Sequence, residues 1–188
     1  QIDDENAPKY EDYAKRITDV ISEEAAKYNL PLPKLRIEPG RLISGPCGVA
    51  VGTVGAVKVG DKKKWVNLDL STNVLSWAAI LDWYYHAVPV ENTEREATET
   101  VDIVGPLCNS DEIGKQRKMP PLVRGEHVAF LDAGGYVESQ AARYNAQCLP
   151  ATVLVFNELS EITTEREQLR DVSGRFRVPP RLLAQSFS

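Results

Sequence analysis

Glu38, Pro39, Gly40 and Arg41 bring a carboxylate, a turn, an unhindered backbone and a guanidinium together within four consecutive positions. A glycine backbone and an arginine can hold a phosphate group between them, and a carboxylate can pair with a ring nitrogen. A strand-ending turn with a surface ion pair would use the same residues. The segment therefore indicates either an anion-binding site or an ordinary turn.

Cys108 and Tyr136 are the other candidates for chemistry. Cys108 follows an apolar stretch and stands among polar groups, although an unpaired cysteine is more often a small buried hydrophobe. Tyr136 ends the segment that begins at Asp132, in which small residues let a backbone approach a ligand and the phenol can donate to it. A tight corner around a buried tyrosine explains the same pattern.

The charge balance and the apolar pattern argue against two classes of partner. The 188 residues include 22 Lys and Arg against 27 Asp and Glu, a net charge of −5, and no dense basic block offers a footprint for nucleic acid. The most apolar stretch, 74–90, is interrupted by Asp82 and His86, and is shorter than the roughly 20 apolar residues that a membrane span needs. We therefore expect neither a nucleic-acid partner nor a membrane span.

Cysteine and histidine usage argues against disulfides and metal sites. Cys47, Cys108 and Cys148 are an odd number without close pairs, unlike a disulfide framework or a zinc ribbon. His86 and His127 have no further ligand type at metal-binding spacing. We expect no bound metal and a cytoplasmic location.

The elements that must position these residues are of two kinds. Apolar residues recur at steps of three and four across 8–29, which predicts a helix that Asn29 and the prolines after it bring to an end. Leu35 to Glu38 then predicts a short strand. This pair is typical of an α/β unit, yet it is too small to build its own layer of parallel sheet.

From about residue 43 the chain is rich in Val, Thr and Gly. Short runs between turn residues predict a mainly antiparallel sheet, with strands at 49–59, 64–70, 99–104, 127–131 and 151–156. The stretch 75–86 fits a short buried helix or irregular packing. A capping box at Thr164 to Glu167, with Gly174 after it, predicts a brief helix. The predicted fold class is mainly β, a barrel or sandwich domain over 46–188 after a helix and strand within 1–45.

Four segments carry a family resemblance when they are taken together and in order: Glu38 to Arg41, Gly105 to Cys108, Asp132 to Tyr136, and Tyr144-Asn145. They resemble the pyridoxal-phosphate decarboxylases that pair a (β/α)8 barrel with a β domain, and the diaminopimelate branch more than the ornithine branch. The resemblance implies that residues 1–45 are the last helix and strand of the barrel and 46–188 the C-terminal β domain.

The resemblance also implies a cofactor, pyridoxal 5′-phosphate. Glu38 would pair with the protonated pyridine nitrogen, so that the ring can accept the electrons released when carbon dioxide leaves. Backbone at Gly40 and the side chain of Arg41 would hold the cofactor phosphate, and Tyr136 would donate a hydrogen bond to it.

Cys108 would return a proton to the substrate α-carbon, reaching into the active site of the other subunit of a homodimer. An ordinary thiol suits this role because it is mostly protonated at neutral pH. Asn109, Ser110 and Asp111 would face the distal end of an amino-acid substrate.

Three departures from the family shape the hypothesis. The family's aldimine lysine, stacking histidine and glycine-rich loop all lie upstream of the resemblance, and Gln1 is not an initiator. We therefore expect the C-terminal portion of a longer enzyme, or a piece that works beside a chain supplying the rest of the barrel.

The other two departures concern the substrate. Asn109 replaces the family's glutamate, which removes the charge match for an ammonium group. Trp77 and Leu81 stand where the family has an arginine and a tyrosine for the distal carboxylate. We expect decarboxylation of an amino acid that differs from diaminopimelate or is a modified, larger or carrier-attached form.

Two other hypotheses stay open. A decarboxylase-like protein without activity could survive as a regulatory or binding partner, although nothing would then retain Glu38, Arg41, Cys108 and Tyr136 together. Racemases share the barrel and a β domain, but they lack the Gly-Pro-x-Cys segment.

Overall fold

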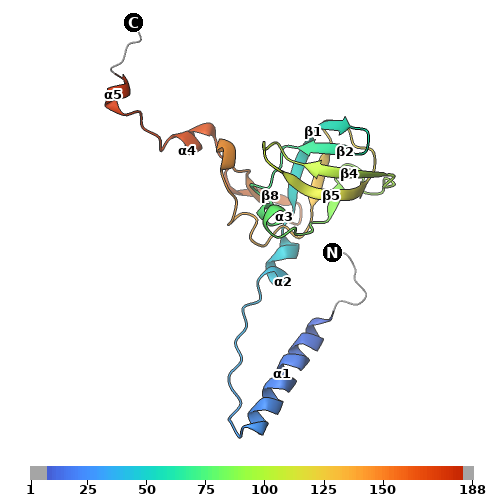
Figure 1. Ribbon diagram of the computed structural model, residues 1–188, viewed down its shortest axis with the longest axis vertical. Helices are drawn as coiled ribbons and strands as arrows, with labels where there is room; N and C mark the ends of the chain where they lie inside the picture. Colours follow the sequence, from blue (N-terminus) through green and yellow to red (C-terminus); the bar gives the residue numbers. More distant parts are fainter. Residues whose placement is uncertain (1–7, 184–188) are drawn as a thin grey trace.

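Six strands build the main body of the molecule, which a computed structural model describes over residues 8–183 (Figure 1). They are β1 (Ala50–Val59), β2 (Lys64–Leu68), β3 (Ala87–Pro89), β4 (Glu99–Val104), β5 (Glu112–Met119) and β6 (His127–Phe130). Their order is β3-β6-β1-β2-β4-β5, and the two edge strands β3 and β5 also lie in contact, so the sheet curls into a nearly closed barrel. The predicted mainly β fold is confirmed.

Strand pairing follows the predicted antiparallel pattern with one exception. β1 pairs antiparallel with β2 and β6, β3 with β6, and β4 with β5, whereas β2 and β4 run parallel. A parallel pair needs a long crossover, and here the crossover carries α3 (Ser76–Ile80) and β3. This crossover packs residues 71–85 against the barrel, where Leu75, Ala78 and Tyr85 are buried.

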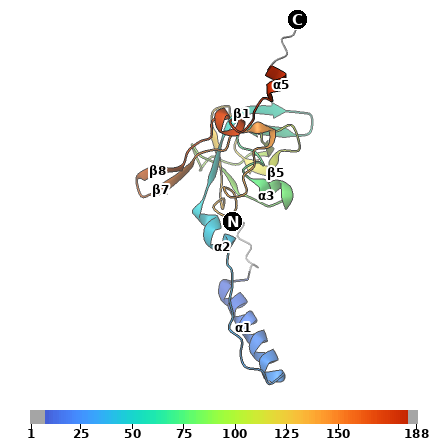
Figure 2. The same cartoon turned by 90° about the vertical axis from the view of Figure 1, so that its left-hand side faces the viewer.

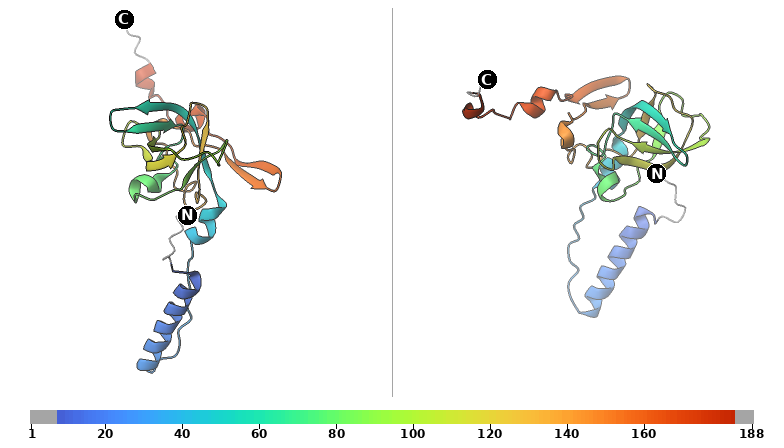
Figure 3. Two further views of the ribbon diagram at one scale, coloured as in Figure 1. Left: turned by 90° about the vertical axis from the view of Figure 1, so that its right-hand side faces the viewer. Right: turned by 45° about the horizontal axis from the view of Figure 1, so that its top comes forward.

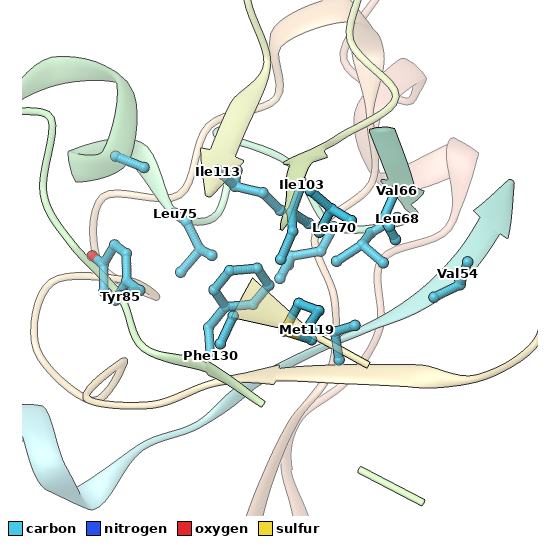
Figure 4. Close-up of a cluster of buried hydrophobic side chains, with 14 of the residues drawn as sticks. Val54, Val66, Leu68, Leu70, Leu75, Tyr85, Ile103, Ile113, Met119 and Phe130 are labelled. Carbon is cyan, nitrogen blue, oxygen red and sulfur yellow. The ribbon is translucent and has the colours of Figure 1, made fainter. Parts of the chain in front are cut away.

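A single apolar cluster fills the barrel (Figure 4). Its largest fully buried side chains include Tyr85, Phe130, Leu75, Ile103 and Met119. Complete burial of such a side chain contributes about 1.5–3 kcal/mol. Leu75 and Tyr85 flank the crossover helix, so the same cluster fixes both ends of that segment.

The remaining elements lie outside the barrel. They are α1 (Tyr10–Lys27), α2 (Arg41–Ser44), the 3-10 turns Gly45–Cys47 and Tyr144–Ala146, the hairpin of β7 (Thr152–Phe156) and β8 (Leu159–Thr164), α4 (Leu169–Ser173) and α5 (Pro180–Leu183). The hairpin projects from the barrel in two opposite views (Figure 2 and the left panel of Figure 3). α1 stands apart, joined by an extended segment.

The predicted first helix is confirmed as α1. Asn29 adopts the left-handed conformation, and the N–H groups of Leu30 and Asn29 donate to the carbonyls of Ala25 and Ala26, a Schellman closure. The apolar stripe of α1 is largely exposed, with Tyr13 57% and Ile17 41% accessible to solvent. Except at the buried Ala25, residues 8–183 therefore leave the stripe of α1 without a packing partner.

Two local predictions were wrong. Leu35 to Glu38 lies outside any strand, because no strand of residues 8–183 pairs with this extended segment and a strand requires a hydrogen-bonded neighbour. The capping box at Thr164 was also misplaced. Thr164 ends β8, and the box forms at Gln168 and Asp171, while Gly174 does end the helix.

The predicted division between residues 45 and 46 falls inside the first 3-10 turn, Gly45–Cys47, and residues 1–7 and 184–188 of its two parts lie outside the described residues. No helix within residues 8–183 is long and apolar enough to cross a bilayer. Over the same residues, no group of three or more His, Cys, Asp or Glu side chains is placed to hold a metal ion.

Candidate cofactor site

The corner from Asp132 to Tyr136 docks on the segment that leads into β1. The N–H of Ala133 donates to the Gly48 carbonyl at 2.8 Å and that of Gly134 to the Gly45 carbonyl at 2.9 Å. A Cβ atom on Gly134 would lie 2.0 Å from the carbonyl oxygen of Ser44. Only glycine fits between these backbones, so the corner and α2 are held as one unit.

This docking brings three of the predicted cofactor residues together. A Cβ atom on Gly40 would lie 2.6 Å from the hydroxyl oxygen of Tyr136, so the phenol packs directly on the glycine that precedes α2. Tyr136 itself has a φ of 69°, in the left-handed region. Arg41, the first residue of α2, is therefore next to the phenol.

Arg41 is enclosed by aromatic rings. Its guanidinium carbon lies 4.4 Å from the ring centroids of Trp77 and Trp83, 5.5 Å from that of Tyr136 and 5.8 Å from that of Tyr85. We call these five residues the aromatic box. Cation–π attraction to several faces holds the guanidinium in place. Burial raises the pKa of Tyr85, and the Arg41 cation opposes that shift.

The hydrogen bonding of Arg41 is incomplete. Nη1 donates to the carbonyl of Asp132 at 3.4 Å, whereas Nε and Nη2 are buried without a partner. Buried polar atoms without a partner are rare, and each calls for an explanation. Two donors on one guanidinium edge match the bidentate geometry of an oxyanion. The residues present therefore fit a cofactor phosphate.

Glu38 does not contact the aromatic box. Its side chain is exposed in the segment that connects α1 and α2, and it has no hydrogen bond or ion pair to the residues that the structure describes. Its only link with the box is its position in the chain, two residues before Gly40.

Cys108 lies in a separate cluster, the turn of residues 105–111, hereafter the Cys108 turn. The thiol is exposed, and Nδ2 of Asn145 donates to its sulfur at 3.2 Å. Asn145 has a φ of 58° within the 3-10 turn Tyr144–Ala146. The predicted proton donor therefore faces outward with an amide beside it.

Asp111 shapes this turn from within. It is 4% exposed, and its carboxylate accepts the N–H and the hydroxyl of Thr72 at 2.7 Å each and the N–H of Leu107 at 2.9 Å. Of the three predicted substrate residues, Asn109 and Ser110 are exposed, but the Asp111 carboxylate points into the protein. Through its bonds to Thr72 and Leu107, the carboxylate holds the backbone of the Cys108 turn in place.

Sequence reasoning missed the buried turn Ser71-Thr72-Asn73. Nδ2 of Asn73 donates to the Tyr144 carbonyl at 2.9 Å, and the Ser71 hydroxyl donates to Oε1 of Gln147 at 3.1 Å. The turn thus ties the Asn145 segment to the Cys108 turn. A run of three small polar residues between apolar Leu70 and Val74 was the available signal.

A cavity of about 370 Å³ adjoins the Cys108 turn. Asn109 and Ser110 line it on one side and Trp65 and Asn67 on the other, and Oδ1 of Asn67 is buried without a partner. Within residues 8–183, no hydrogen bond or ring contact joins Cys108 to the aromatic box. Apart from Glu38, the predicted residues therefore form two clusters on one chain.

Comparison with known families decides the assignment. The family described as "Pyridoxal-dependent decarboxylase, C-terminal sheet domain" matches residues 13–134. The chain belongs to this decarboxylase family. The match covers most of α1, the Cys108 turn and every residue of the box except Tyr136, and it confirms the resemblance derived from the sequence.

Individual decarboxylases are similar over most of the chain. The diaminopimelate decarboxylase of Methanothermobacter thermautotrophicus is 30% identical over 174 residues, which are 92% of this chain and 40% of the relative. The crystal structure of diaminopimelate decarboxylase from M. jannaschii has a TM-score of 0.84, with 30% identity over 95% of this chain and 41% of that one.

A second M. jannaschii structure, in co-complex with L-lysine, has a TM-score of 0.78 and 32% identity over 89% of this chain and 39% of that one. The chain thus spans about 40% of the length of the decarboxylases it matches.

Proposed function

We propose that this chain is the C-terminal part of a pyridoxal-phosphate-dependent amino-acid decarboxylase. One observation carries the proposal: two buried guanidinium donors of Arg41 have no partner, beside Gly40 and Tyr136, where the resemblance puts the cofactor phosphate. The exposed stripe of α1 supports the second half of the proposal, in which the rest of a (β/α)8 barrel covers it. In this proposal residues 1–45 complete that barrel and 46–188 form the β domain.

The proposed roles follow from the two clusters. Backbone at Gly40, the guanidinium of Arg41 and the hydroxyl of Tyr136 hold the cofactor phosphate. Glu38, exposed in this chain, pairs with the pyridine nitrogen. When bound, the cofactor supplies the electron sink for loss of the α-carboxylate.

Cys108 holds a proton on its sulfur and delivers it to the substrate α-carbon. Its separation from the aromatic box supports a homodimer in which each Cys108 serves the site of the partner subunit. Asn145 orients the thiol through its hydrogen bond. A reducing cytoplasm suits this role because it keeps Cys108 a free thiol.

We infer that the substrate is an amino acid other than diaminopimelate. The distal side chain would lie against Asn109 and Ser110 at the cavity beside the Cys108 turn. Asn109 and Ser110 are neutral, and Trp77 is committed to Arg41, so these positions offer no charge for a distal ammonium or carboxylate. Charged Lys58 and Glu112 also line the cavity, and a modified or larger side chain would meet them in place of the family's charge pattern.

The test uses the full-length protein loaded with pyridoxal 5′-phosphate. We expect a visible absorption band from the bound cofactor and release of carbon dioxide from one member of an amino-acid panel that includes diaminopimelate. Cys108→Ala should lower turnover by about 100- to 10,000-fold and leave the band intact, whereas Cys148→Ala should behave as the parent enzyme.

A binding protein without activity is the alternative. It predicts no band and no carbon dioxide from any amino acid, even with the whole chain present. That result would overturn the proposed function.

A further inference from the structure

Trp77 contacts both of the side chains expected to hold the cofactor phosphate. Its ring stacks on Tyr136 at a centroid distance of 4.7 Å and an interplanar angle of 12°, and it lies 4.4 Å from the Arg41 guanidinium carbon. We propose that Trp77 is a positioning residue, which sets Arg41 and Tyr136 relative to each other for one phosphate. The inference rests on the proposed function.

The indole is itself fixed in orientation. Its ring N–H donates to Oε1 of Gln140, and α3, which carries it, is anchored by buried Ala78 and by Leu75 just before it. Trp83 meets Trp77 edge to face, at 5.7 Å and 78°. A ring held from three sides can act as a template for the two groups on its faces.

Trp83 does not share this double contact. It lies 4.4 Å from the Arg41 guanidinium carbon but has no ring contact with Tyr136 among the described residues. Removal of Trp83 should therefore loosen Arg41 alone, whereas removal of Trp77 should loosen both phosphate ligands. The structure thus distinguishes Trp83, which only encloses Arg41, from Trp77, which contacts both Arg41 and Tyr136.

A rival explanation is that Trp77 only packs against the core, which it also contacts. Packing alone would affect the affinity for any form of the cofactor equally. Positioning of phosphate ligands acts only on a ligand that carries the phosphate. Pyridoxal, which lacks the phosphate, therefore separates the two explanations.

The experiment measures dissociation constants of the full-length apoenzyme for pyridoxal 5′-phosphate and for pyridoxal. Trp77→Leu should weaken binding of the phosphate form by about tenfold, the size of one to two lost cation–π or hydrogen-bond contacts. Pyridoxal binding should stay within about twofold of the parent value. Phe156→Leu, a change at an exposed ring of β7 that does not touch Arg41, should leave the ratio of the two dissociation constants unchanged.

Trp77→Phe covers the case in which Trp77→Leu fails to fold. Phenylalanine keeps a stacking face but loses the bond to Gln140, so the ratio should fall between those of the parent and Trp77→Leu. The near-ultraviolet circular dichroism of the apoenzyme gives a readout free of cofactor, because the stack with Tyr136 is an ordered aromatic pair. Trp77→Leu should change that signal and Tyr136→Leu should change it in the same way.

The outcomes are distinct. A parent enzyme that binds pyridoxal 5′-phosphate while the Trp77 variants lose affinity for both forms equally would overturn the positioning role and spare the proposed function. A parent enzyme that binds neither form would overturn both.

Discussion

The Asp111 carboxylate accepts two hydrogen bonds from a single residue, Thr72, one from its backbone N–H and one from its hydroxyl. Both distances are 2.7 Å, and both residues are buried. The pair joins the turn after β2 to the turn that carries Cys108. The turn that carries the exposed thiol of Cys108 is thus held in place by a buried carboxylate.

Asp111→Asn should destabilise the protein. An amide keeps the shape of the side chain but replaces one acceptor with a donor that faces other donors, and we expect the free energy of unfolding to fall by about 1.5–3 kcal/mol. Urea denaturation of the full-length enzyme measures the change. Ser110→Ala, in the same turn but exposed, is the control and should be neutral. Equal stability of the two variants would refute the role given to Asp111.

Gly40→Ala should displace Tyr136 without unfolding the protein. The new methyl group would lie 2.6 Å from the phenolic oxygen but 3.6 Å from the next ring carbon, and the end of a side chain can move aside. We expect affinity for pyridoxal 5′-phosphate to fall by up to about tenfold, the loss of one hydrogen bond. Equilibrium dialysis measures it.

The double variant Gly40→Ala, Tyr136→Phe provides the matched control for that change. Removal of the hydroxyl relieves the contact, so the double variant should bind the cofactor no worse than Tyr136→Phe alone. Additive losses would show that Gly40 acts by another route.

Gly134→Ala should have a much larger effect on folding than Gly40→Ala. Its methyl group would meet the backbone oxygen of Ser44 at 2.0 Å, and neither backbone can yield without breaking the corner. We expect a loss of about 1–3 kcal/mol in unfolding free energy, measured by thermal denaturation. Gly55→Ala, whose methyl group would find its nearest neighbour at 3.8 Å, should unfold close to the parent protein.

Glu167 should make stability depend on pH in the acid range. The Arg143 guanidinium and the N–H of Leu149 lower its pKa to about 2. A carboxylate with a depressed pKa stabilises the fold fully above its unfolded pKa, and this stability is lost as pH falls toward 2. Glu167→Gln should therefore be less stable at neutral pH and lose less stability between about pH 4.5 and 2.

Melting temperatures across that pH range measure the effect of Glu167. Glu165→Gln, two residues away and exposed, is the control and should follow the parent curve. Parallel curves for the parent and Glu167→Gln would contradict the prediction.

Local sequence patterns predicted the helices and strands whose signals lie within the element itself. The apolar steps of α1, its closure at Asn29 and the Val-rich run of β1 are short-range features, and all three were placed correctly. β5 was missed because its sequence has few apolar residues and depends on hydrogen bonds to β4. Leu35 to Glu38 failed for the opposite reason, since a strand pattern without a neighbour forms no strand.

The site was predicted in part for the same reason. Motif residues Gly40, Arg41 and Tyr136 do come together. Three of the four rings that enclose Arg41, Trp77, Trp83 and Tyr85, come from the crossover 71–85, whose apolar pattern did not reveal which side chains would turn toward α2. Long-range contacts such as Thr72 to Asp111 lie 39 positions apart and leave no periodic trace.

The separation of the aromatic box from the Cys108 turn bears on genetics. In the proposed dimer, a chain with Cys108→Ala still carries an intact box, and a chain with Arg41→Met still carries an intact thiol. Two alleles that are each inactive would then complement when coexpressed, because every mixed dimer contains one complete pair. Two alleles damaged in the same cluster would not.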